Sequence, residues 1–152
     1  MIRRDAGLEP GAFGTNAYGA SPAKKTRTPP YARVGRVLYA LLASVLVACV
    51  VVQVFFAGLG AFGADWSWHL TFVHLLQPLP LLMIPMAFVG RLPWGLRLLP
   101  LGLLILIGAQ YAFADTAVPA AALHPVNALL IFWVSLHIAR QALAAVTEQI
   151  KG

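Results

Sequence analysis

The side chains with the greatest chemical potential in this sequence are histidines and amides that stand inside long uncharged stretches. They are His69, His74, His124, Gln53, Gln77, Gln110 and Asn127. One imidazole from each of two helices can hold a haem iron, and amides can bond the polar groups of a cofactor. Because polar groups are costly in hydrocarbon, each of these residues is a candidate for a site if its stretch crosses a membrane.

The elements that must position these residues follow from the spacing of charges. Asp, Glu, Lys and Arg are missing from four windows, at 37–64, 66–90, 98–114 and 116–139. About 20 apolar residues suffice to cross a hydrocarbon core of about 30 Å. Lipid forces backbone groups to pair internally, and the windows lack the alternating polarity of barrel strands. We therefore predict an all-α, four-helix transmembrane bundle with spans near 37–57, 70–89, 97–114 and 121–140.

Composition narrows the class of protein further. Of the 152 residues, 60% are hydrophobic and 11% are charged, whereas soluble domains are about a quarter charged. The single cysteine, Cys49, excludes a disulfide framework and a cysteine-rich metal site. The sequence shows no phosphate loop, nucleophile triad or carboxylate pair, so a binding or structural role is favoured over an enzymatic one.

The basic residues predict an orientation. With four spans, all eleven Lys and Arg residues fall on one side, and the two opposite loops carry only Asp65 and Asp115. The positive-inside rule then predicts a multi-pass protein of the cell membrane with both termini in the cytoplasm. The net charge of +6 indicates contact with anionic lipids, and no nucleic-acid partner is expected.

The first 30 residues differ in composition from the rest. They are rich in Gly, Ala, Pro and Thr and have no helical apolar period, so they cannot offset the entropy cost of ordering. We predict a flexible cytoplasmic tail at 1–30 and a four-span domain at 31–152. An arm that orders against a partner through Phe13 and Tyr18 is the alternative.

The predicted topology gathers the polar residues at one depth. Gln53 and Gln110 lie near the outer ends of spans one and three, and the remaining polar residues lie near the outer starts of spans two and four. His69 and His74 differ by about 140° around a helix, so they cannot share one face. We expect His74 and His124 to be the iron ligands of a haem b, because His69 lies at the lip of the span. If span four begins at Pro125, which suits the first helical turn, His124 lies at the interface and His69 is the nearer partner.

Two other uses of this polar layer remain open. The same donors could bind a quinone or another amphipathic ligand. They could also act only as interhelical hydrogen bonds, worth about 0.6 kcal/mol each. In that case the protein is a cofactor-free accessory subunit of a larger membrane complex or of a homo-oligomer.

Two stretches carry a resemblance to known proteins. QVFFAGLG at 53–60 and LHPVNALL at 123–130 resemble a bacterial family of short four-span membrane proteins without an assigned function, over roughly 37–143. A histidine on span two followed by His-Pro at span four is similar, by analogy, to four-helix b-type cytochromes. That likeness implies haem ligation. The cytochromes with two haems need more paired histidines, which argues against transmembrane electron transfer by this chain alone.

The topology is tested with reporter fusions at residues 62, 92 and 117. A fusion at 92 is expected to be cytoplasmic and those at 62 and 117 external, because every basic residue lies on one side. A cytoplasmic signal at 117 would contradict the four-span topology.

Overall fold

The computed structural model describes residues 28–114 and 116–151, and this part of the chain is helical with no strand. The elements are α1 (Pro30–Ala61), α2 (Ser67–Leu76), α3 (Pro78–Val89), α4 (Trp94–Ala114), the short 3₁₀ helix η1 (Ala120–Ala122) and α5 (Leu123–Lys151). The predicted all-α fold class is confirmed. The predicted tail falls almost wholly on residues 1–27, outside the described residues.

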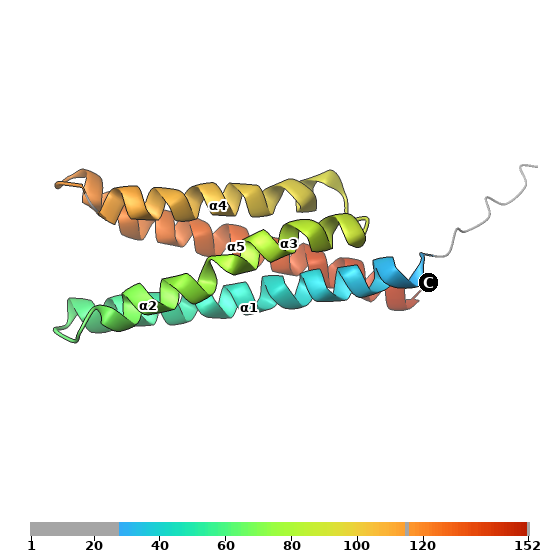
Figure 1. The fold of residues 1–152 in the computed structure, drawn as a ribbon, viewed down its shortest axis with the longest axis horizontal. Coiled ribbons are helices and arrows are strands. Elements are labelled where there is room, and N and C mark those ends of the chain that lie inside the picture. Colours follow the sequence, from blue (N-terminus) through green and yellow to red (C-terminus); the bar gives the residue numbers. More distant parts are fainter. Residues whose placement is uncertain (1–27, 115, 152) are drawn as a thin grey trace, which may run out of the picture.

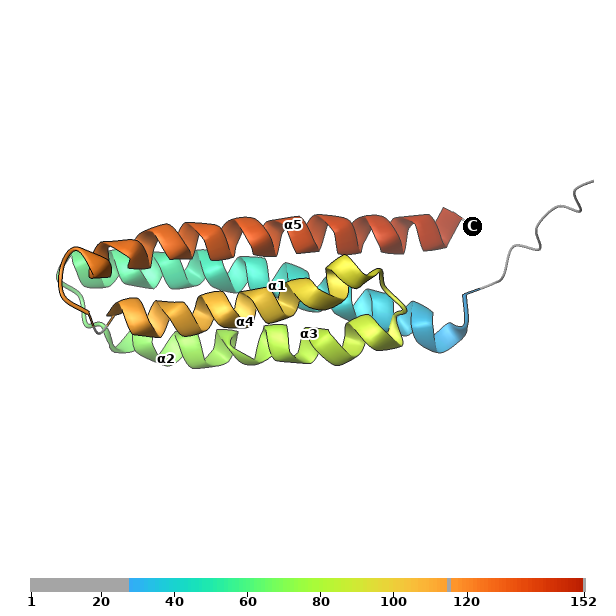
Figure 2. The same ribbon diagram turned by 90° about the horizontal axis from the view of Figure 1, so that it is seen from above.

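Four helical passes are long and apolar enough to cross a membrane, as predicted. They are Pro30–Ala61, Ser67–Val89, Trp94–Ala114 and Ala120–Lys151. The first and last are longer than the predicted spans, because charged residues end an apolar window without ending a helix. The start of α1 and the end of α5 therefore project together past the α3–α4 turn (Figures 1 and 2). The Arg33 guanidinium donates to the Gln149 carbonyl there, at 3.3 Å.

Prolines divide the second pass into α2 and α3. Pro78 and Pro80 have no N–H, so the carbonyls of His74 and Leu76 lose their helical donors. Gln77 keeps helical backbone angles at the junction, and its N–H still donates to the Val73 carbonyl at 3.1 Å. The pass consequently continues in one direction with a break in its hydrogen bonds.

The passes pack closely at one end of the bundle and separate at the other. We call the end that holds the start of α1, the α3–α4 turn and the end of α5 the terminal end, and the opposite end the hairpin end. The buried core includes Tyr39, Leu46, Met83, Leu103 and Ile138. At the hairpin end, α2 contacts α1 but makes no close backbone contact with α4 or α5. Figure 1 shows the pair α1–α2 diverging there from α4 and the start of α5.

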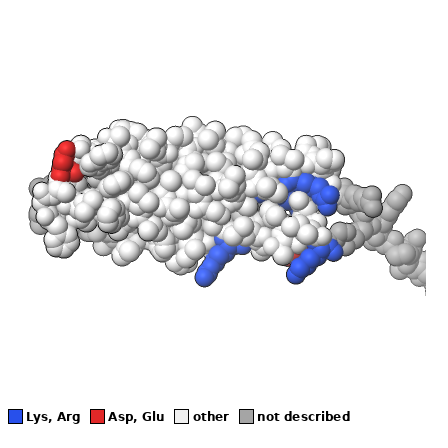
Figure 3. Space-filling view, turned by 90° about the horizontal axis from the view of Figure 1, so that it is seen from below, with Lys and Arg blue, Asp and Glu red and all other residues white. Residues whose placement is uncertain are grey.

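Charge is distributed unevenly between the two ends. On the face shown in Figure 3, the Lys and Arg side chains lie in the half of the molecule that contains the terminal end. Asp65 lies in the α1–α2 connection at the hairpin end. It accepts hydrogen bonds from the hydroxyl and the backbone N–H of Ser67, and these bonds lower the pKa of its carboxyl group.

Glycines allow α1 and α3 to approach closely at the terminal end. A Cβ atom added to Gly35 would lie 2.6 Å from the Gly90 backbone nitrogen, closer than real Cβ contacts. The Arg36 Nε donates to the Gly90 carbonyl at 2.9 Å across the same crossing. Small residues at helix crossings are the usual way for membrane helices to pack backbone against backbone.

A buried tyrosine satisfies a carbonyl that a proline leaves without its helical donor. Pro100 lies inside α4 and has no N–H for the carbonyl of Leu96, four residues earlier. The Tyr39 hydroxyl, on α1, donates to this carbonyl at 2.6 Å, and Tyr39 is fully buried. This bond ties α1 to α4 and removes an unpaired polar group from the core.

Substituting Gly35 by Ala should destabilise the bundle by about 1–3 kcal/mol, because the new methyl group meets backbone that must shift. Gly58→Ala is the matched control on the same helix, since a Cβ there meets nothing within 4 Å. The free energy of unfolding in mixed detergent micelles measures both. Equal stability of the two variants would contradict the close crossing.

The pairing of Tyr39 with the Leu96 carbonyl is tested by a double-mutant cycle. Tyr39→Phe should cost about 1–3 kcal/mol, because it leaves a buried carbonyl without a donor. In a Pro100→Ala background the cost should fall, since residue 100 then supplies the helical N–H. Unfolding free energies of the four proteins give the coupling. If Tyr39→Phe lowers the unfolding free energy equally in both backgrounds, the Tyr39 hydroxyl does not stabilise the protein through the Leu96 carbonyl.

Candidate functional site

A cavity of about 310 Å³ lies at the hairpin end, where the passes separate. This volume is at the lower end of the range of small-molecule sites, about 300–1,000 Å³. Most of its lining is aliphatic, and its polar lining residues are Gln53, His69, Gln110 and His124. Val54 and Leu129, which also line it, are 52% and 69% exposed. The cavity therefore opens sideways, toward the lipid that surrounds such a bundle.

On the α1–α2 side, Gln53 and His69 are bonded to each other. The Gln53 side-chain amide donates to the His69 carbonyl at 3.0 Å, and His69 Nδ1 lies 3.3 Å from the Gln53 carbonyl oxygen. Because a carbonyl only accepts, this contact assigns the proton to Nδ1, and the lone pair on Nε2 faces the Gln53 amide nitrogen at 3.4 Å. The Gln53 Oε1 atom is buried without a hydrogen-bond partner.

On the α4–α5 side, a second cluster joins Gln110, His124 and Asn127. His124 Nδ1 lies 3.1 Å from the Gln110 carbonyl oxygen, so its Nε2 also carries the lone pair. The Asn127 amide donates to Gln110 Oε1 and to the Leu106 carbonyl, each at 2.8 Å. Asn127 is buried and holds the Gln110 side chain without lining the cavity itself.

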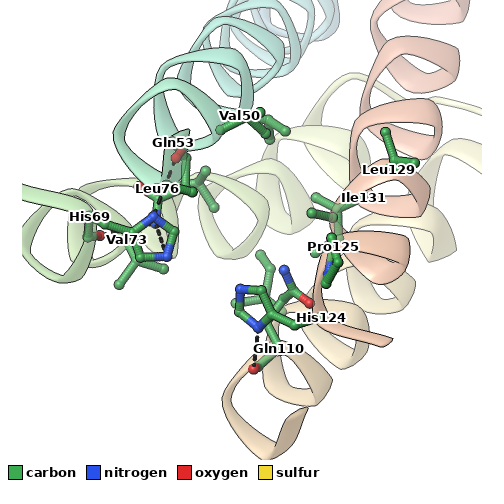
Figure 4. Close-up of a pocket in the computed structure, with 14 residues that line it drawn as sticks. Val50, Gln53, His69, Val73, Leu76, Gln110, His124, Pro125, Leu129 and Ile131 are labelled. Carbon is green, nitrogen blue, oxygen red and sulfur yellow. Dashed lines mark hydrogen bonds between the residues drawn. The ribbon is translucent and has the colours of Figure 1, made fainter. Parts of the chain in front are cut away.

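The two histidines face each other across the cavity from different hairpins (Figure 4). Their ring centroids are 6.3 Å apart, and their planes are inclined by 53°. Two imidazoles on opposite sides of one metal atom have their nitrogens about 4 Å apart, since a metal–imidazole bond is about 2.0 Å. The distance from each ring nitrogen to the centroid of its own ring accounts for the remainder of the centroid separation. The separation thus suits two axial ligands of one metal.

The structure does not bring His74 to this site. His74 is exposed and does not line the cavity, whereas His69 does. Of the predicted pair, His124 lines the cavity and His74 does not, and His69 lies opposite His124 instead. The predicted depth in the membrane placed both α2 histidines near the site. Depth does not define which way a side chain faces around the helix, and in the structure it is His69 that is bonded to Gln53 beside the cavity. The alternative in which His69 is the nearer partner of His124 agrees with the geometry.

The remaining predicted residue, Gln77, lies apart from both clusters. Its amide donates to the Tyr111 hydroxyl at 2.7 Å, on the exposed surface between the α2–α3 junction and α4. The expected single polar layer is instead two clusters, each within one hairpin. Among residues 28–114 and 116–151, no three His, Cys, Asp or Glu side chains gather as a metal cluster. A site here offers two protein ligands from histidine.

Sequence reasoning missed the support behind His69. The Trp66 ring packs edge-on against the His69 ring, with centroids 5.6 Å apart. A Cβ at Gly60 would lie 2.6 Å from the Trp66 ring, so only glycine admits the indole at this position. Sequence analysis predicts no role for these residues in the site. A glycine near the end of an apolar helix, followed by a tryptophan, was the available signal.

Fold and site together define a small multi-pass membrane protein with a cavity between two helical hairpins. Residues 53–117 are similar to a family of unknown function, DUF6220. The match covers less than half of the chain and contains Gln53, His69 and Gln110, but not His124. No curated protein and no solved structure matches the chain. The likeness to a family without an assigned function is thus supported, and the bacterial and cytochrome likenesses stay predictions.

Proposed function

We propose that this protein binds one haem b between its two hairpins, with His69 and His124 as the axial ligands. One observation carries the proposal: two imidazoles from opposite hairpins face each other with centroids 6.3 Å apart. We further propose that the protein is a non-enzymatic subunit of the cell membrane with cytoplasmic termini. The gathering of basic side chains toward the terminal end supports this orientation.

The hydrogen bonds behind each imidazole support ligation. A metal-bound histidine almost always donates its second N–H to a carbonyl or carboxylate, which fixes the tautomer and the ring orientation. Here the Gln53 and Gln110 carbonyls accept from Nδ1 of His69 and His124, respectively. The Nε2 atom of His124 therefore carries a lone pair that an iron atom could accept, and the Nε2 atom of His69 would bind iron in place of its 3.4 Å contact with the Gln53 amide nitrogen.

The donor set also fits haem better than a bare metal ion. A haem supplies four ring nitrogens of its own, so the protein needs to provide only two axial ligands. Structural zinc sites need four protein ligands, and no cluster of three is found in the described residues. When bound, the haem supplies one-electron chemistry. The chain holds the iron, fixes the two tautomers and surrounds the site with aliphatic side chains.

The packing of the bundle allows a flat group to enter. Because α2 makes no close backbone contact with α4 or α5, the hairpins can separate at this end without opening the core at the other. Each polar cluster is bonded within its own hairpin, and the Gln77 amide donates across to the Tyr111 hydroxyl on the exposed surface.

The proposal is tested with the reduced visible spectrum of the purified protein, expressed with an adequate haem supply. His69→Ala and His124→Ala should each abolish the low-spin haem band, because either change removes an axial ligand. His74→Ala is the matched control on α2, since His74 is exposed outside the cavity, and it should keep the band.

Size-exclusion profiles and circular dichroism of the same variants show whether each remains folded. Loss of the band in His74→Ala with retention in His69→Ala would overturn the assignment. A wild-type protein with no haem band would contradict the proposal and favour a cofactor-free accessory subunit, in which the two clusters only join helices.

A further inference from the structure

We infer that a second cavity, at the terminal end, binds the headgroup of a phospholipid that carries a phosphodiester and a primary ammonium. Phosphatidylethanolamine has this chemistry. The cavity, of about 370 Å³, lies between α1, the start of α4 and the last turns of α5. It is lined by Arg36, Leu92, Pro93, Leu96, Gln141, Ala144, Ala145 and Glu148. It lies at the opposite end from the candidate haem site and is independent of it.

Arg36 supplies the group for the phosphate. Its Nε donates to the Gly90 carbonyl at 2.9 Å, which fixes the direction of the guanidinium. The other N–H groups of a guanidinium form a planar fork that matches phosphate oxygens. Arg36 is half-buried, so its charge is less screened than that of a fully exposed arginine. This position is pre-organised for an anion.

One face of α5 supplies the group for the ammonium. Gln141, Ala144, Ala145 and Glu148 stand at positions i, i+3, i+4 and i+7, so they share a face. The small side chains of Ala144 and Ala145 leave room for the cavity. Glu148 lies two turns beyond Gln141, toward the C-terminal end of α5. The Gln141 amide nitrogen is 2.6 Å from His137 Nε2, which leaves Gln141 Oε1 as a further acceptor.

Along the membrane normal, the apolar, cationic and acidic groups of the cavity follow the order that a phospholipid headgroup would need. Leu92 and Leu96 form the apolar part of the lining and are almost fully buried. Arg36 lies where the first uncharged window begins, at the expected level of lipid phosphates. Glu148 lies farther along α5, toward the aqueous side. A phosphate at Arg36 therefore places its ammonium arm toward Glu148.

The ammonium distinguishes among common phospholipids. An ethanolamine ammonium donates three hydrogen bonds to acceptors such as Glu148, whereas the quaternary ammonium of choline donates none. A glycerol headgroup carries no positive charge for the carboxylate. We therefore expect phosphatidylethanolamine to bind more tightly than phosphatidylcholine by about tenfold, the effect of one charged hydrogen bond.

The experiment measures lipid binding to the full-length protein in detergent, as the rise of its melting temperature with added lipid. Phosphatidylethanolamine should stabilise at about tenfold lower concentration than phosphatidylcholine or phosphatidylglycerol with the same acyl chains. Glu148→Gln, at an exposed position where folding is preserved, should abolish this preference. Arg36→Gln should weaken the response to every phospholipid.

Arg140→Gln is the matched control, since Arg140 is an exposed cation of α5 outside the cavity lining. It should leave the preference unchanged. An unchanged preference in Glu148→Gln, or tightest binding of phosphatidylglycerol, would overturn the proposal. If soluble phosphoethanolamine binds as tightly as the lipid, the site takes a soluble phosphate ester and the lipid assignment is wrong.

Discussion

Every polar group inside this bundle must find its partner within the protein, because the surrounding lipid supplies none. The helices meet most of this demand through their own backbone bonds, and prolines create the exceptions. In α4 the exception is met by another helix, since the Tyr39 hydroxyl serves the Leu96 carbonyl that Pro100 leaves free. A carbonyl that lacks its donor within α4 thereby accepts a hydrogen bond that joins α1 to α4. The same demand makes the unpaired Gln53 Oε1 atom at the cavity conspicuous.

This constraint acts differently at the two ends of the bundle. At the terminal end, Gly35 and Gly90 bring α1 and α3 into backbone contact, and the Tyr39 bond adds α4. At the hairpin end, polar side chains pair inside each hairpin and leave the space between the hairpins without cross-links from the two clusters. The protein consequently has a closely packed end and an end with a cavity between the hairpins.

The number of passes could be predicted from the sequence because charges in lipid are costly over a fixed thickness. The depth of Gln53, His69, Gln110 and His124 followed from the same argument. Their grouping could not be predicted, because depth fixes a residue along the membrane normal and leaves its rotation around the helix open. His69 and His74 show this: they are close in depth, yet one lines the cavity and the other is exposed. The helix ends were also unpredictable, since α1 and α5 continue through charged residues.

The tautomers of the two histidines determine which ring nitrogens could bind a ligand. Carbonyls of the neighbouring helices accept from both Nδ1 atoms, so both Nε2 atoms carry lone pairs, and that of His69 faces the Gln53 amide nitrogen at 3.4 Å. The free amide oxygen of Gln53 adds a third acceptor nearby. The side-chain amide nitrogen of Gln110, whose oxygen already accepts from Asn127, adds a hydrogen-bond donor to the same lining. The lining thus offers lone pairs to a metal and N–H groups to a carbonyl oxygen, so the haem proposal rests on the pairing of His69 with His124 across the cavity and not on the number of acceptors.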